Sequence, residues 1–167
     1  MSELYVLRHC KSDWGRGIAS DSDRPLSERG IENAGRLGAW MKQNGYIPRQ
    51  ILSSNAVRAK QTIQLVCEHS GIDRQAIQYL PELYLASRAK LIATINEHRS
   101  GDSPLIIVGH NPGMDELVKY LAKNDVPYTE QGKLMTTGCL ARFLLPEAEQ
   151  DLHHACELLS ITRPSDI

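Results

Sequence analysis

Apolar and polar positions alternate along the chain with two different periods, which predict strands and helices in turn. Short apolar runs predict six strands: Leu4–Leu7, Gln50–Ser53, Ile77–Leu80, Leu105–Val108, Leu140–Leu145 and Cys156–Ile161. Apolar residues that recur every three or four positions predict helices: Ser27–Asn44, Asn55 to about His69, Ser87 to about His98, and a helix from Asn111-Pro112 onward. Because strands and helices alternate, we expect an α/β fold, a three-layer sandwich with a mostly parallel central sheet and helices on both faces.

The ends of the predicted helices carry residues that suit those positions. Short polar side chains, which can accept hydrogen bonds from free backbone N–H groups, stand before each helix: Ser27, Asn55, Ser87 and Asn111. Pro112 follows Asn111 and is expected to be the first residue of its helix. The stretch from Cys10 to Leu26 has no period and is rich in Ser, Asp and Gly, so it is predicted to be a loop.

Composition narrows the class of protein. The chain has 167 residues and neither a repeat nor a low-complexity segment, so residues 1–167 are expected to form a single domain. Its formal net charge of −1 argues against general nucleic-acid binding, which needs a basic excess. No apolar stretch approaches the roughly 18 residues of a membrane span. The four cysteines form no CxxC pair and the first residues do not resemble a signal peptide, so we expect a cytoplasmic protein with reduced thiols.

Cationic side chains and imidazoles follow the predicted strands at their carboxyl ends. Arg8 and His9 follow the first strand, Arg58 lies one turn into the helix after the second, and His110 follows the fourth. Glu82 follows the third strand. In open α/β sheets, ligands bind beyond the carboxyl ends of the strands. Because guanidinium groups and helix N-termini suit phosphate, we expect a compact cationic pocket for a phosphoryl group.

These residues belong to five sequence blocks that occur in a known order. The blocks are Leu7-Arg8-His9-Cys10-Lys11-Ser12, Asp21-Ser22-Asp23-Arg24-Pro25-Leu26-Ser27-Glu28-Arg29-Gly30, Ser53-Ser54 to Arg58-Ala59-Lys60-Gln61-Thr62, Pro81-Glu82-Leu83-Tyr84 and Val108-Gly109-His110-Asn111-Pro112-Gly113. Together they resemble the histidine phosphatase superfamily, which has the phosphoglycerate mutase-like fold, and within it the SixA-like phosphohistidine phosphatases. The resemblance covers nearly the whole chain.

The resemblance implies a role for each candidate. His9 would attack phosphorus and form a phosphohistidine enzyme. Arg8, Arg58, His110 and Asn111 would bind the phosphoryl oxygens. For the acid that protonates the leaving group, Glu82 matches the position of the superfamily's usual acid, and Asp21 is the alternative.

No cofactor is expected, because the sequence offers no carboxylate cluster for magnesium, and His153-His154 is interpreted as a solvated pair rather than a metal site. The superfamily commonly has Arg-His-Gly where this chain has Arg8-His9-Cys10. Cys10 is interpreted as a small filler residue, and the alternative is a redox-sensitive thiol beside the cationic site.

The size of the loops bears on the substrate. The chain has room for the sheet, its helices and two modest loops, about Cys10–Leu26 and Asp125–Gly138, so no long insertion is available as a lid. An open site admits a phosphorylated side chain still attached to a protein, so we expect phosphohistidine on a partner protein as substrate. Trp14 is expected to pack locally or to contact such a partner. Two alternatives stay open, a small-molecule phosphomonoesterase and a catalytically silent phosphate-binding adaptor, and the oligomeric state is undetermined.

Overall fold

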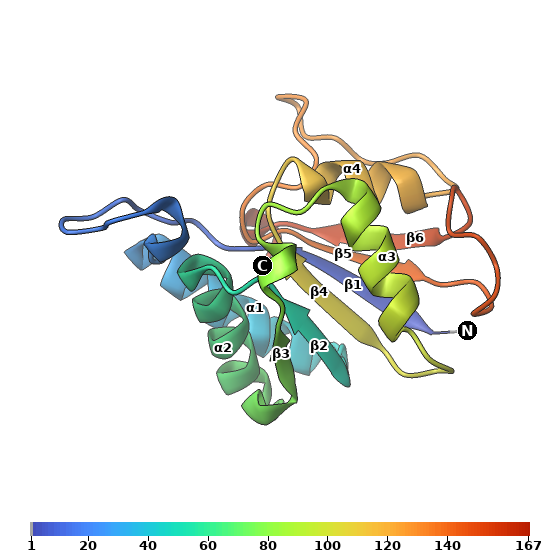
Figure 1. Ribbon diagram of the computed structural model, residues 1–167, viewed down its shortest axis with the longest axis horizontal. Coiled ribbons are helices and arrows are strands. Elements are labelled where there is room, and N and C mark those ends of the chain that lie inside the picture. Colours follow the sequence, from blue (N-terminus) through green and yellow to red (C-terminus); the bar gives the residue numbers. More distant parts are fainter. Residues whose placement is uncertain (1) are drawn as a thin grey trace.

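The computed structural model describes residues 2–167, whose strands form a mixed sheet in the order β3-β2-β4-β1-β5-β6 (Figure 1). The strands are β1 (Glu3–Arg8), β2 (Gln50–Ser53), β3 (Ile77–Tyr79), β4 (Leu105–Gly109), β5 (Leu140–Leu144) and β6 (Glu157–Thr162). The four strands from β3 to β1 are parallel, and β5 and β6 extend the sheet as antiparallel strands. The predicted strands and the mostly parallel sheet are confirmed.

Helices cover both faces of the sheet (Figure 1). They are α1 (Glu28–Gln43), α2 (Val57–Ser70), α3 (Arg88–His98) and α4 (Gly113–Leu121). Successive residues of a strand point to opposite faces, so β1 contributes to two cores. Leu4 and Val6 pack in the cluster that contains α3 and α4, whereas Tyr5 and Leu7 pack with α1 and α2. This arrangement confirms the three-layer α/β sandwich. No helix within residues 2–167 is long and apolar enough to cross a membrane.

Two of the four predicted helix caps are correct. The Ser27 and Ser87 hydroxyls accept hydrogen bonds from backbone N–H groups of α1 and α3. The prediction for Asn55 is wrong, because α2 begins at Val57 after Ala56, which offers no capping side chain. The prediction for Asn111-Pro112 is correct in part: α4 begins one residue later than expected, at Gly113, but the Asn111 Oδ1 accepts the Asp115 N–H of its first turn at 3.1 Å.

The register of the parallel strands brings their carboxyl ends together. Arg8 of β1 lies opposite Gly109 of β4, and the His9 N–H donates to the Gly109 carbonyl at 3.1 Å. On the other side of β4, the Ser54 N–H donates to the Val108 carbonyl at 3.0 Å. The residues that follow β1, β2 and β4 therefore meet at one edge of the sheet.

Candidate active site

A cavity of about 480 Å³ opens at this edge. Its lining residues come from β1, the Lys11–Arg24 loop, α2, β4 and the segments that precede α3 and β5: Arg8, His9, Lys11, Ser12, Asp21, Arg24, Arg58, Leu85, His110, Asn111 and Thr137. Four of them are cationic at neutral pH and a single one is a carboxylate. The structure therefore brings together all the site residues expected from the sequence except Glu82.

The imidazole of His9 is held with its Nε2 atom unprotonated. Nδ1 lies 2.7 Å from the Cys10 carbonyl oxygen, which can only accept, so Nδ1 carries the proton. Nε2 faces the Arg58 Nε–H at 3.4 Å. Burial, and then the charges of Arg58, Arg8 and Arg24, lower the pKa of His9 from 6.5 to about 4. At neutral pH the ring is therefore neutral, and its Nε2 lone pair, which accepts the long hydrogen bond from Arg58, is the one that a nucleophile would use.

His110 lies beside His9, with 5.1 Å between the ring centroids. Its Nε2 is 2.8 Å from the Ser54 hydroxyl, which itself accepts the Ala56 N–H. Burial, and then the neighbouring His9 and Arg58, lower the pKa of His110 to about 3, so this ring is also neutral. Its Nδ1 is buried and has no hydrogen-bond partner among residues 2–167, which leaves one polar atom of this cavity-lining ring for a ligand.

The two predicted arginines are fixed by backbone contacts. Arg58 is buried in the first turn of α2, and its Nη1 donates to the Asp21 carbonyl at 2.7 Å. Arg8 donates from Nη1 to the Met135 carbonyl at 3.0 Å, while its Nε is buried without a partner among the described residues. Both guanidinium groups keep their positive charge and retain N–H groups that a phosphoryl oxygen can accept from.

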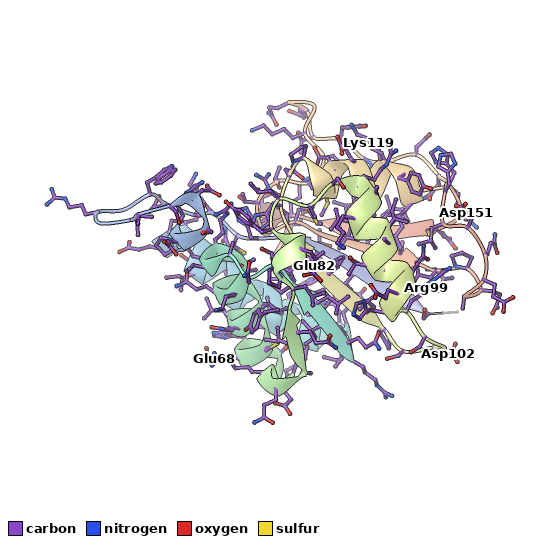
Figure 2. The ribbon with its side chains drawn as sticks, viewed as in Figure 1. Glu68, Glu82, Arg99, Asp102, Lys119 and Asp151 are labelled. Carbon is purple, nitrogen blue, oxygen red and sulfur yellow. The ribbon has the colours of Figure 1, made fainter. Side chains whose placement is uncertain are left out.

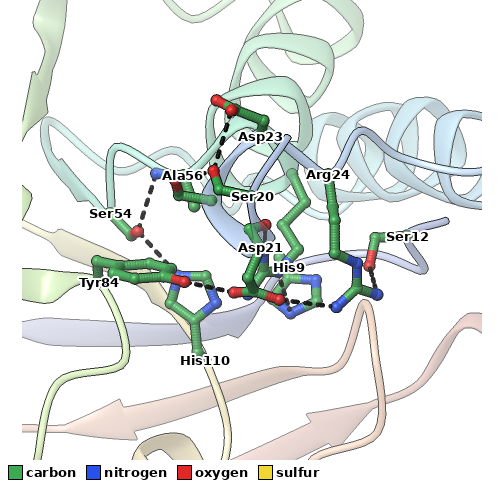
Figure 3. A network of polar contacts seen from close by, with 12 residues as sticks. His9, Ser12, Ser20, Asp21, Asp23, Arg24, Ser54, Ala56, Tyr84 and His110 are labelled. Carbon is green, nitrogen blue, oxygen red and sulfur yellow. Dashed lines mark hydrogen bonds and ion pairs between the residues drawn. The ribbon is translucent and has the colours of Figure 1, made fainter. Parts of the chain in front are cut away.

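Asp21 is the carboxylate of the cavity (Figure 3). Its Oδ1 accepts from Arg24 at 3.0 Å, and its Oδ2 accepts from Arg58 at 2.9 Å and from the Tyr84 hydroxyl. These hydrogen bonds, that of Tyr84 foremost, hold the pKa of the Asp21 carboxyl far below its usual range. Asp21 is therefore ionised at neutral pH and holds no proton to give to a leaving group.

Glu82, the first candidate for the acid, does not line the cavity. It lies exposed on the Pro81–Leu83 turn that follows β3 (Figure 2). The reason is topological: β3 is the edge strand, and β2 and β4 separate it from β1. The next turn of the chain brings Tyr84 toward the site instead.

Sequence reasoning missed Arg24 and Tyr84 as parts of the site. Arg24 bridges Asp21 and the Ser12 hydroxyl, to which it donates at 2.8 Å, and its guanidinium lies 5.1 Å from the ring centroid of Trp14. The spacing of Asp21 and Arg24, three residues apart, was the available signal for this pair. Trp14 is 56% exposed, so local packing against Arg24 leaves much of its ring open.

The thiol beside the site is buried. Cys10 is 1% exposed, and burial raises the pKa of its thiol to about 12. Because the reactive species is the thiolate, this environment favours the interpretation of Cys10 as a filler residue. Within residues 2–167, no group of three or more His, Cys, Asp or Glu side chains is arranged to hold a metal ion.

Comparison with known proteins identifies the family. The model of the histidine phosphatase superfamily (branch 1) matches residues 4–100, and the chain belongs to this superfamily. It is 40% identical to an uncharacterized protein of Mycobacterium tuberculosis over 116 residues, 70% of each chain. It is 26% identical to the phosphohistidine phosphatase SixA of Escherichia coli over 148 residues, 87% of each chain. The crystal structure of the SixA protein from Agrobacterium tumefaciens matches 98% of both chains with a TM-score of 0.81 and 28% identity. The phosphoglycerate mutase-like fold expected from the sequence is thereby confirmed.

Proposed function

We propose that the protein is a metal-independent phosphatase that removes the phosphoryl group from phosphohistidine on a partner protein, through a phosphohistidine intermediate on His9. The observation that carries this proposal is the neutral His9 ring, whose Nε2 lone pair faces a cavity with four cationic side chains. A nucleophile next to fixed positive charge suits attack on a dianionic phosphoryl group.

In the first step, the His9 Nε2 lone pair forms an N–P bond while the P–N bond to the substrate imidazole breaks. Arg8, Arg58 and the Nδ1 atom of His110 would hold the phosphoryl oxygens and stabilise their charge. The departing imidazole nitrogen takes its proton from solvent. In the second step, water attacks phosphorus, inorganic phosphate leaves, and the His9 lone pair is restored.

The leaving group supports phosphohistidine over a phosphate ester. An alkoxide needs a proton as it departs, and the carboxylate of the cavity, Asp21, is ionised and paired with two arginines. An imidazole nitrogen is a better leaving group than an alkoxide, so a phosphoramidate places little demand on an acid. A small-molecule phosphomonoesterase stays the alternative, because the same cations would bind an ester.

Two further features support a protein substrate. Trp14, which packs against the cavity-lining Arg24, is 56% exposed and can contact a partner protein. The Escherichia coli relative is named a phosphohistidine phosphatase. A catalytically silent adaptor is disfavoured, because binding alone does not require a neutral imidazole whose Nε2 atom carries no proton.

The test compares kcat/KM for a histidine-phosphorylated phosphocarrier protein, for sugar phosphates and for an aryl phosphate. We expect the phosphoprotein to be the best substrate, and we expect His9→Ala to lower every rate by more than about 10³-fold. His153→Ala, an exposed histidine outside the cavity, is the matched control. A preference for a sugar phosphate would favour the small-molecule alternative, and full turnover by folded His9→Ala would reject the mechanism.

A further inference from the structure

A second cavity, of about 550 Å³, adjoins the first and plays no part in the chemistry proposed above. Lys11 and Thr137 line both cavities, so the two are neighbours. The second cavity lies between α1, the segment before β5 and the end of the chain after β6. We call it the cationic groove.

The groove is lined by more cationic than acidic side chains. Four cations line it, and Glu32 is the acid beside them: the cations are Lys11, Arg29, Arg36 and Arg163. The ion pairs found within residues 2–167 involve none of these four side chains. The side chains of Lys11, Arg29 and Arg36 are therefore available to a ligand, whereas the Arg163 guanidinium already donates to backbone carbonyls.

The cations are spaced out rather than convergent. Arg29 and Arg36 are seven residues apart on α1 and share one face, which separates them by about 10 Å along the helix axis. Arg163 is held on the other side by hydrogen bonds to the Leu134 and Pro127 carbonyls. An extended peptide of about three residues covers this length. Spaced cations fit a row of separate carboxylates better than one compact phosphate.

The groove has a fixed position relative to the catalytic cavity. The backbone N–H and the hydroxyl of Ser27, the N-cap of α1, both donate to the Lys11 carbonyl, at 2.9 and 3.1 Å. The Gly138 N–H, next to Thr137, donates to the Arg8 and His9 carbonyls at 3.1 and 3.0 Å. A ligand in the groove is therefore held in register with the His9 nucleophile.

We propose that the cationic groove binds an acidic segment of the phosphoprotein, next to its phosphohistidine. This proposal rests on the proposed function and names the kind of partner that the site accepts. Rim charges of this type accelerate encounter with an oppositely charged protein and set its orientation. The groove thus selects phosphohistidines that have acidic neighbours.

The experiment uses synthetic histidine peptides phosphorylated with phosphoramidate. The peptides form two pairs. Within a pair, the three residues on one side of the phosphohistidine are Glu in one peptide and Gln in the other. One pair varies the N-terminal side of the phosphohistidine, and the other varies the C-terminal side. We expect one acidic peptide to be favoured about tenfold in kcat/KM, through KM, at low ionic strength. The preference should shrink in high salt.

Variants link that preference to the groove. In the double variant Arg29→Gln, Arg36→Gln, the ratio of acidic to neutral turnover should fall to about one. The control Arg49→Gln, Arg74→Gln removes the same charge from exposed positions outside both cavities and should keep the ratio.

Four outcomes overturn the proposal. Equal turnover of acidic and neutral peptides, or a preference that survives in the double variant, rejects acidic docking but leaves the phosphohistidine activity intact. If inorganic tripolyphosphate inhibits the protein but not the double variant, and acidic and neutral peptides are turned over equally, the groove binds a small polyanion instead. Failure to hydrolyse any of the peptides, with an aryl phosphate still hydrolysed, rejects the proposed function and this proposal together.

Discussion

The lowered pKa of His9 predicts an unusual dependence of activity on pH. The perturbation is acidification from pH 7.5 to 5.5 with an aryl phosphate as substrate. The nucleophile acts only in its neutral form, and kcat/KM follows the ionisation of the free enzyme. Because burial and the neighbouring guanidiniums lower the pKa of His9 to about 4, the ring should stay neutral across this range.

The size of the effect follows from the two pKa values. With a pKa of about 4, about 97% of the rings are neutral at pH 5.5, so protonation of His9 costs almost nothing in kcat/KM. With the ordinary value of about 6.5, the neutral fraction would fall about tenfold between pH 7.5 and 5.5. A measurement of kcat/KM at pH 7.5 and 5.5 therefore distinguishes the lowered pKa from the ordinary one.

The assay is a series of initial rates from pH 8 to 4.5, with the ionisation of the substrate measured by phosphorus NMR and divided out. Return of full activity at pH 7.5 after each exposure controls for unfolding. A tenfold decline with its midpoint near pH 6.5 would refute the reasoning, since it would mean that the imidazole is not shielded from water.

Three shorter predictions concern stability and metal dependence. The unfolded chain protonates His9 and His110 near pH 6.5 while the folded chain keeps them neutral to about pH 4 and 3, so stability is lost as pH falls. Urea titrations should find about 2 kcal/mol lost per histidine between pH 7 and 5, and equal stability would contradict this. In Gly30→Ala the new Cβ would lie 2.1 Å from the Lys11 carbonyl oxygen, so thermal denaturation should reveal a free energy of unfolding lower by about 1–3 kcal/mol. Gly35→Ala is the control, because its Cβ would meet only the His69 side chain, and it should lose less stability. A larger loss in Gly35→Ala than in Gly30→Ala would contradict the prediction. EDTA should leave turnover unchanged, because guanidinium groups supply the positive charge that binds the phosphoryl group. Loss of activity on EDTA treatment that added metal restores would disprove this prediction.

Much of the fold could be predicted because the strong signals are local. Leu105–Val108 is an apolar run with turn residues on both sides, and it forms the buried strand β4 next to β1. The cap at Ser27 succeeds since the required acceptor is three residues from its donor. The cap at Asn55 fails because Ser54, held by His110, takes the local N–H instead. That contact joins residues 56 positions apart, which sequence spacing does not reveal.

The cavity-lining residues at strand ends could be predicted for a similar reason, since parallel topology gathers strand ends at one edge. The acid could not. Asp21 lies in a loop without a period, and its place depends on Arg58, Arg24 and Tyr84, which lie on three different segments. Glu82 follows a strand as expected, but the order of strands puts that strand at the edge of the sheet.

The central claim is that His9 becomes phosphorylated during turnover. The most direct measurement mixes the protein with a phosphorus-32 labelled phosphohistidine protein, stops the reaction within milliseconds in alkali, where phosphohistidine is stable, and locates the label by peptide mapping. The account predicts label on the peptide that contains His9, released as phosphate on a longer chase. Turnover at the normal rate with no label on that peptide, or with label on another residue, would contradict it.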